Sequence, residues 1–124
     1  MKVLMDANFL LIPGKFKVDV FEEIKVFGNP EFFTLDKVVK EIEKIAKEGG
    51  RDSKHAHMAL FFIDSKGVNV VKSKPRKRTD DELLRIAKEG DFIVCTQDRE
   101  LIKKLRKKSV EVISLRQRKY LVKI

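Results

Sequence analysis

The strongest constraint on the fold is the alternation of short apolar runs with amphipathic segments. Residues 3–5 and 92–95 are compact apolar runs, and each is followed within a few residues by an acid. Residues 68–71, 110–115 and 120–124 are further candidate strands. Strands that alternate with helices through short connections form a mainly parallel sheet covered by helices on both faces. We therefore expect an α/β fold.

The helices expected between these strands are bounded by capping residues and glycines. Thr34 and Thr79 are candidate N-caps, and Gly49 and Gly90 are candidate stops. The expected helices cover residues 18–27, the segment from Thr34 to Gly49, the segment from Asp52 or Ser53 to about Gly67, the segment from Thr79 to Gly90, and the basic stretch around Leu101 and Leu105.

Length and cysteine content limit the class of protein. The 124 residues, 43% of them apolar, suffice for one core, so we expect a single domain over residues 1–124. One cysteine excludes a disulfide-stapled scaffold and a zinc finger, and it favours a reducing, cytoplasmic compartment. No stretch approaches the roughly 20 apolar residues that span a bilayer, so we expect no membrane association.

Positive charge is concentrated in the second half of the chain. The net charge is +9, with −1 on residues 1–65 and +10 on residues 66–124. The densest runs are residues 72–78, 103–108 and 116–119. Each run alone is compatible with solvated surface, but three in one half favour a polyanionic partner such as nucleic acid.

Acidic residues mark the expected ligand-binding end of the sheet. Asp6 and Asp98 follow the two compact apolar runs, and ligands of open parallel sheets bind at the carboxyl ends of strands. Asp80 and Asp81 open a helix, where capping alone would explain one of them. Glu41 and Glu43 border the apolar stripe of another helix, and periodicity does not choose between them.

Carboxylates that converge without basic partners repel, and a bound divalent cation relieves that repulsion. Oxygen ligands suit Mg²⁺ or Mn²⁺, and such ions activate water and stabilise charge on a phosphodiester under attack. A basic domain with an acidic metal centre fits nuclease chemistry, and simple capping and surface roles are the alternative.

Four segments, in order, resemble the motifs of the PIN-domain ribonucleases along nearly the whole chain. The first departs from the family pattern in having Ala7 where Thr is usual. The second selects Glu41 over Glu43, and the third favours Asp80 over Asp81. The segments are Val3-Leu4-Met5-Asp6-Ala7-Asn8-Phe9-Leu10-Leu11, Val39-Lys40-Glu41-Ile42-Glu43-Lys44-Ile45, Thr79-Asp80-Asp81-Glu82-Leu83-Leu84 and Val94-Cys95-Thr96-Gln97-Asp98-Arg99-Glu100-Leu101.

The resemblance implies a three-layer α/β/α sandwich and a Mg²⁺- or Mn²⁺-dependent endoribonuclease that hydrolyses RNA phosphodiester bonds. The implied catalytic residues are Asp6, Glu41, Asp80 and Asp98, and the implied metal ligands are Asp6, Asp80, Asp98 and Asp81. Asn8 and Thr96 would hold the acids in place. The expected RNA-binding residues are Lys72, Lys74, Arg76, Lys77, Arg78 and Arg99.

Within the superfamily, the motifs are most similar to the PIN nucleases of eukaryotic small-subunit ribosomal RNA processing and their archaeal relatives. VapC toxins are a more distant resemblance. Processing of a ribosomal RNA precursor is therefore one expected role. There are two alternatives, a non-catalytic RNA-binding ribosome-assembly factor and a VapC-type toxin that an antitoxin protein holds inactive. By analogy with the family, we also expect a homodimer.

Overall fold

The computed structural model describes residues 1–124. Its elements, in chain order, are β1 (Lys2–Met5), α1 (Ala7–Leu10), α2 (Ile12–Phe16), α3 (Val20–Glu23), the 3-10 helix η1 (Ile24–Phe27), β2 (Glu31–Leu35), α4 (Asp36–Glu48), α5 (Ser53–Ser65), β3 (Asn69–Val71), α6 (Thr79–Gly90), β4 (Ile93–Cys95), α7 (Arg99–Lys107), β5 (Val112–Arg116) and β6 (Tyr120–Lys123).

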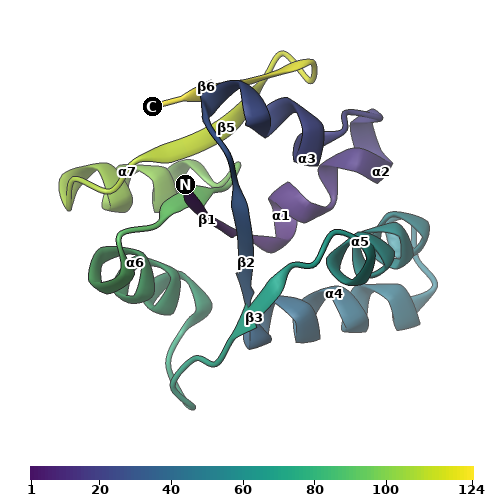
Figure 1. The fold of residues 1–124 in the computed structure, drawn as a ribbon. Helices are drawn as coiled ribbons and strands as arrows, with labels where there is room; N and C mark the ends of the chain where they lie inside the picture. The colour runs from purple at the N-terminus through teal and green to yellow at the C-terminus, as the bar shows by residue number, and fades with distance from the viewer.

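The six strands form one sheet in the order β3-β2-β1-β4-β5-β6. All neighbours are parallel except β5 and β6, which are antiparallel. Helices α1 to α5 lie on one side of the sheet, and α6 and α7 lie on the other (Figure 1). The predicted α/β class and three-layer arrangement are confirmed. None of the helices combines the length and apolar content needed to cross a membrane.

The core is built where the apolar runs predicted it. Val3, Leu4 and Met5 of β1 are fully buried because helices cover both faces of the central strands. Ile42 of α4 and Leu101 of α7 are likewise inaccessible to solvent, and they pack on opposite sides of the sheet. A central strand that is buried on both faces therefore consists of consecutive apolar residues, without the polar alternation of a half-exposed strand.

Strand β2 was not expected, and the predicted capping role of Thr34 is wrong. Thr34 is a buried strand residue whose Oγ1 donates to the carbonyl oxygen of Met5 at 2.6 Å. Leu35 takes the N-cap position of α4, and the helix begins at Asp36. The aromatic residues Phe32 and Phe33 favour a strand, but they pair with β1 and β3 only through long-range contacts.

Two other helix boundaries differ from the prediction. The segment 18–27 is divided into α3 and η1. Asp19 accepts hydrogen bonds from Phe21 N and Glu22 N and thereby starts α3 at Val20. At α6, Arg78 is the N-cap and Thr79 is already the first helical residue. The basic segment, defined here as residues 72–78, thus leads directly into α6.

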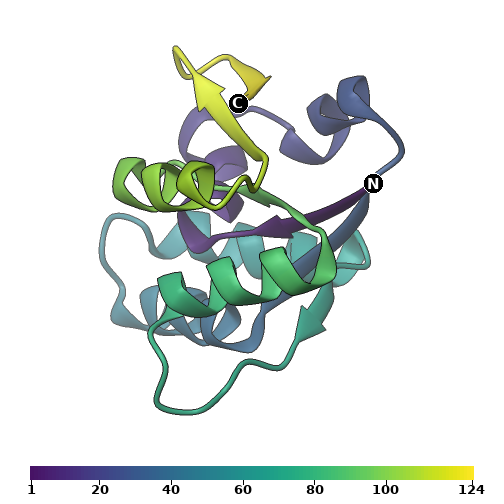
Figure 2. The same cartoon turned by 90° about the vertical axis from the view of Figure 1, so that its left-hand side faces the viewer.

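Strands β1 and β4 lie side by side in the centre of the sheet. The strand order reverses between them, since β2 and β3 follow on one side of β1 and β4, β5 and β6 lie on the other. In such sheets the loops at the carboxyl ends of the two strands diverge and leave a crevice. Figure 2 shows α6 and α7 in front of the sheet, with the basic segment curving below α6 and joining its amino end. The residues that follow β1 and β4 therefore share one end of the molecule with the start of α6.

Candidate acidic active site

Asp6 is held rigidly at the carboxyl end of β1. Its Oδ1 accepts a hydrogen bond from Ala7 N at 2.8 Å, so the carboxylate also caps the short helix α1. Its Oδ2 accepts from Thr96 Oγ1, also at 2.8 Å, and its backbone N donates to Cys95 O at 2.9 Å. The side chain is almost completely buried, with 7% of the residue exposed.

Thr96, after β4, connects Asp6 with Asp98. The Thr96 hydroxyl donates to Asp6 and accepts from Asp98 N at 3.1 Å. Asp98 is the N-cap of α7, where its Oδ1 accepts from two backbone N–H groups of the first turn. Asn8 Oδ1 accepts from Gln97 N at 3.0 Å and lies 3.4 Å from Thr96 Oγ1. The loops after β1 and β4 are thus joined by side-chain hydrogen bonds.

The environment of Asp6 disfavours its negative charge. Burial raises the pKa of Asp6 to about 6, although the hydrogen bonds from Thr96 and Ala7 oppose the rise. The negative charges of Asp80 and Glu41 contribute to this rise. Asp80 comes from α6 and Glu41 from α4, so acids from both sides of the sheet act on the carboxyl end of β1.

Asp80 links the remaining acids to this group. Burial raises its pKa, and the charges of Asp98 and Asp81 add to that rise. Lys104 and Arg78 act in the opposite direction. We define the acidic cluster as Asp6, Glu41, Asp80 and Asp98, which lie after β1, on α4, on α6 and after β4. Asp80 and Glu41 act on Asp6, and Asp98 acts on Asp80.

The two pairs of acids left open by the sequence occupy different surroundings. Glu43 lines an exposed groove on α4 together with three lysines and Glu48, whereas Glu41 is among the charges that raise the pKa of Asp6. Asp80 is partly buried at the start of α6, and its neighbour Asp81 is exposed. Glu41 and Asp80 are thus the two acids of these pairs that raise the pKa of Asp6, while Asp81 acts on Asp80.

The donor set of the acidic cluster fits a hard divalent cation. The ion pairs of this structure involve Asp52, Glu22, Glu82, Glu89 and Glu111, so no Lys or Arg forms a salt bridge with the cluster. No three acids or histidines are arranged as a finished ligand set. The carboxylates of the cluster repel one another, and a bound divalent cation would neutralise that repulsion and let them approach as ligands.

The predicted RNA-binding residues are found in two regions, the basic segment before α6 and Arg99 at the start of α7. All five cations of the basic segment are exposed, and the segment runs directly into α6, where Asp80 is the second residue. Arg99, next to Asp98, lines a cavity of about 520 Å³ together with Arg116, Gln97 and Gln117. Both basic regions are thus adjacent in sequence to acids of the cluster, and Arg78 lies close enough to lower the pKa of Asp80.

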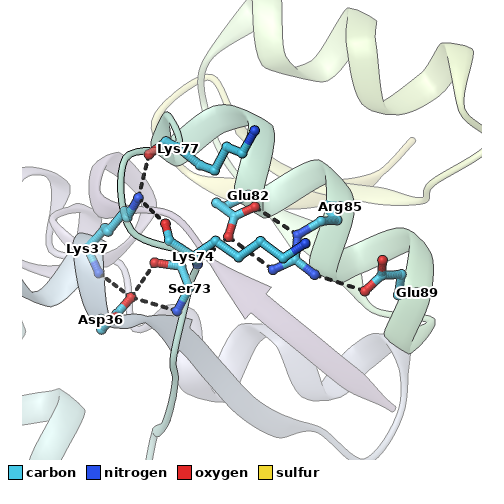
Figure 3. A network of polar contacts seen from close by, with 8 residues as sticks. All are labelled: Asp36, Lys37, Ser73, Lys74, Lys77, Glu82, Arg85 and Glu89. Atoms are coloured by element: carbon cyan, nitrogen blue, oxygen red, sulfur yellow. Dashed lines mark hydrogen bonds and ion pairs between the residues drawn. The ribbon is translucent and has the colours of Figure 1, made fainter.

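Two sets of structural residues near the site were not predicted from the sequence. Gln97 ties the loop after β4 to β5, because its Oε1 accepts from Leu115 N and Ser114 Oγ and its Nε2 donates to Leu115 O. A second set, which anchors the basic segment, centres on Asp36 and Glu82 (Figure 3). Only the pairing of Glu82 with a residue three positions later was visible as a spacing in the sequence.

This fold and site define an α/β protein with an acidic cluster at the switch point of a mainly parallel sheet. The PIN like domain family matches residues 3–118, and the chain belongs to that family. The resemblance to PIN domains noted in the sequence is thereby confirmed.

Curated relatives and solved structures agree with this assignment. The chain is 31% identical to "Ribonuclease VapC4" of Methanocaldococcus jannaschii, with 96% of this chain and 93% of that protein covered. It is 26% identical to "Ribonuclease VapC9" of Archaeoglobus fulgidus over 94% of this chain and 84% of the relative. The PIN domain endonuclease Utp24 has the same fold, with a TM-score of 0.79 at 21% identity over 97% of this chain and 88% of that chain.

Proposed function

We propose that this protein is a divalent-metal-dependent endoribonuclease that hydrolyses RNA phosphodiester bonds. The observation that carries the proposal is the acidic cluster, in which four carboxylates from separate parts of the chain interact and none forms a salt bridge with a Lys or Arg. Family membership and two relatives named as ribonucleases support the same activity. A buried carboxylate with a raised pKa and like-charged neighbours is typical of a functional site.

Asp6, Asp80 and Asp98 would hold Mg²⁺ or Mn²⁺, and Asp81 is a further candidate ligand. When bound, the ion would supply Lewis-acid activation of water and neutralise charge on the phosphate. Asp6 contributes a carboxylate whose two oxygens each already accept one hydrogen bond, so it provides an ordered starting point for the site. The charged form of Asp6 would be favoured by the cation, which reverses the effect of burial.

The remaining polar residues would orient the reacting groups. Glu41 belongs to α4 and is among the charges that act on Asp6, so its carboxylate would accept a hydrogen bond from the attacking water or add a ligand. Thr96 and Asn8 would hold Asp6 and Asp98 in position through the hydrogen bonds between the two loops.

RNA would reach the acidic cluster along the basic surfaces beside it. Lysine and arginine contacts to phosphates provide affinity without choice of sequence. Arg99, adjacent to Asp98, would contact the RNA close to the scissile phosphate. The contacts on the other side of the cluster would come from the basic segment, namely Lys72, Lys74, Arg76, Lys77 and Arg78.

The direct test is incubation of end-labelled single-stranded and hairpin RNAs with the protein, with and without Mn²⁺ or Mg²⁺. We expect metal-dependent internal cuts from the wild type and none from Asp6→Asn or Asp98→Asn. Circular dichroism checks that both variants remain folded. Equal cleavage by the variants would exclude the proposed site, and RNA that is bound but uncut in every condition would favour a non-catalytic assembly factor.

Two matched pairs of variants distinguish cluster residues from their neighbours. Glu41→Gln should lower kcat about 100-fold, whereas Glu43→Gln, on the same helix and with the same charge change, should alter it less than twofold. Asp80→Asn should likewise impair cleavage more than Asp81→Asn. If both members of a pair behave alike, the assignment of that acid to the cluster is wrong.

A VapC-type toxin is the second candidate function, since the 31% identical relative is named as a VapC ribonuclease over nearly the full length of both chains. This function predicts growth arrest on expression, relieved by co-expression of a small antitoxin protein. A role in ribosomal RNA maturation instead predicts accumulation of an uncut precursor when the gene is deleted, without growth arrest on expression.

The assembly state and location follow from family analogy and the single cysteine. We infer a homodimer in the cytoplasm, where the buried free thiol of Cys95 stays reduced. Analytical ultracentrifugation would detect the dimer, with or without an antitoxin partner.

A further inference from the structure

The basic segment is anchored through its backbone to the start of α4. Asp36 Oδ1 accepts hydrogen bonds from Ser73 N at 3.1 Å and Ser73 Oγ at 2.6 Å. The ammonium group of Lys37 donates to the carbonyl oxygens of Lys74, at 2.7 Å, and Lys77. Figure 3 shows both residues reaching across to the segment from α4. Two consecutive residues of one helix therefore fix three positions of the segment.

A second anchor comes from α6, on the opposite side of the sheet. Glu82 accepts a hydrogen bond from Lys74 N, and only 2% of the residue is exposed. Arg85 also donates to Glu82, from Nε at 2.8 Å and from a terminal nitrogen at 3.0 Å, and it pairs with Glu89 (Figure 3). Glu82 is therefore a fixed acceptor, since the arginine restricts its position from the other side.

The tip of the segment is held in a conformation that its sequence disfavours. Arg76 has a φ of 65°, in the left-handed region that glycine adopts most readily. It follows Pro75 and lies between the two carbonyl groups that Lys37 binds. Such a backbone conformation persists only where the surroundings over-determine it, and it is concentrated at functional sites.

The anchors use the backbone and leave the cationic side chains available. Lys72, Lys74, Arg76, Lys77 and Arg78 are all exposed, and none forms an ion pair. An unanchored chain with five positive charges next to the acidic cluster would be drawn toward it. The fixed backbone instead keeps the cations apart from the acids, except that Arg78 lies close enough to lower the pKa of Asp80.

We propose that Asp36, Lys37 and Glu82 are positioning residues that hold the basic segment as a preformed phosphate-binding surface for single-stranded RNA. Arg76 presents its guanidinium at the tip of that surface. The inference rests on the proposed function, because it assigns the segment to the RNA that enters the acidic cluster. A surface ordered before binding avoids the entropy loss of ordering the segment on each encounter, and so increases affinity.

The first test uses variants that remove a negative charge, for which electrostatics and the positioning role predict opposite changes in RNA affinity. Asp36→Ala and Glu82→Gln each remove a negative charge beside the basic segment, so simple electrostatics would strengthen RNA binding. A positioning role predicts the opposite, an increase in Kd of about fivefold or more, because the segment loses an anchor. The control Glu43→Gln removes the same charge from α4 without touching the segment. Kd is measured with a fluorescent 12-nucleotide uridine RNA in the absence of divalent ions.

Lys37→Met provides an independent variant, compared with Lys47→Met on the same helix. Both remove one positive charge, but only the first removes two backbone anchors. We expect Lys37→Met to raise Kd and KM about tenfold and to leave kcat nearly unchanged. Trypsin should also cleave this variant faster within residues 72–78. Lys47→Met should change each quantity less than twofold. Thermal melts confirm that each variant remains folded.

The outcomes separate this inference from the proposed function. If the wild type cleaves RNA but Lys37→Met behaves like Lys47→Met, and Asp36→Ala and Glu82→Gln bind more tightly, the positioning role is excluded and the nuclease stands. If the wild type binds RNA without cutting it in Mn²⁺, the nuclease assignment fails, and the variants' Kd values still decide the positioning role.

Discussion

The Thr96 hydroxyl donates a hydrogen bond of 2.8 Å to Asp6 Oδ2, joining residues that are 90 positions apart in the chain. The two residues follow the parallel neighbours β1 and β4, whose last residues, Met5 and Cys95, are in register. The same hydroxyl accepts from Asp98 N at 3.1 Å. One oxygen atom thereby sets the relative position of two acids proposed to bind metal.

Thr96→Val should separate this positioning role from simple packing. The valine side chain has nearly the same shape, so the fold is retained, but Asp6 and Asp98 N each lose a partner. We expect kcat to fall about 10- to 100-fold and the free energy of unfolding to fall by about 1–3 kcal/mol. Cleavage assays and urea denaturation measure the two effects.

Thr96→Ser is the matched control, because it restores the hydroxyl and removes only a methyl group. It should recover most of the lost kcat. A serine variant as slow as the valine variant would indicate that the methyl packing, and not the hydrogen bond, supports activity.

The raised pKa of Asp6 predicts how the stability of the metal-free protein depends on pH. The folded protein holds the Asp6 proton up to about pH 6, whereas the unfolded chain releases it near 3.8. Asp6 therefore stabilises the fold at low pH, and this contribution is lost as the pH rises from 4 to 6. The difference corresponds to about 3 kcal/mol.

The measurement compares urea unfolding of the wild type and Asp6→Asn between pH 4 and 7 without divalent ions. The wild type should lose about 3 kcal/mol relative to the variant over this range, and Mn²⁺ should restore the wild type alone at pH 7. Parallel pH profiles for the two proteins would contradict the proposed burial of a carboxylate that titrates here.

The sheet was largely predictable from the sequence because its central strands are buried on both faces. Such strands have to be short and uniformly apolar, as residues 3–5 and 92–95 are, and the acids that follow them mark the crevice at their carboxyl ends. Strand β2 escaped prediction because Thr34 is a good N-cap residue by type. Its contact with Met5 spans 29 residues, and local patterns contain no information about it.

The same limit applies to the site. The acids are visible as residue types at strand and helix ends, but their mutual effect on pKa depends on how α4, α6 and the strands pack together. The anchors of the basic segment are less visible still. Asp36 and Ser73 are 37 positions apart. Each is a residue type that is common on the surface of helices and loops, so neither stands out in the sequence.

Glu82 predicts a pH dependence opposite to that of Asp6. The hydrogen bonds from Arg85 lower its pKa to about 2, well below the ordinary 4.5. Its charge therefore stabilises the folded state above pH 4.5, and this contribution is lost as the pH falls toward 2. At pH 7, Glu82→Gln should reduce the free energy of unfolding by about 2 kcal/mol.

The control is Glu89→Gln, which removes the exposed partner of the same arginine. We expect it to cost less than about 0.5 kcal/mol, since surface ion pairs contribute little. Urea unfolding at pH 7 and pH 3 should show the Glu82→Gln deficit shrinking in acid. An equal deficit at both pH values would mean that the carboxylate charge is not what stabilises this site.

The basic segment predicts the salt dependence of RNA binding. Each phosphate neutralised on a single strand contributes about −0.7 to the slope of log Ka against log salt concentration. Removing both charges in Lys72→Ala/Lys74→Ala should therefore make the slope shallower by about 1.4, whereas Lys44→Ala/Lys47→Ala on α4 should leave it unchanged. Fluorescence anisotropy with the 12-nucleotide uridine RNA between 50 and 300 mM KCl measures the slopes. Equal slopes for the two double variants would place the RNA on another surface, and the cavity beside Arg99 and Arg116 would then be the next region to test.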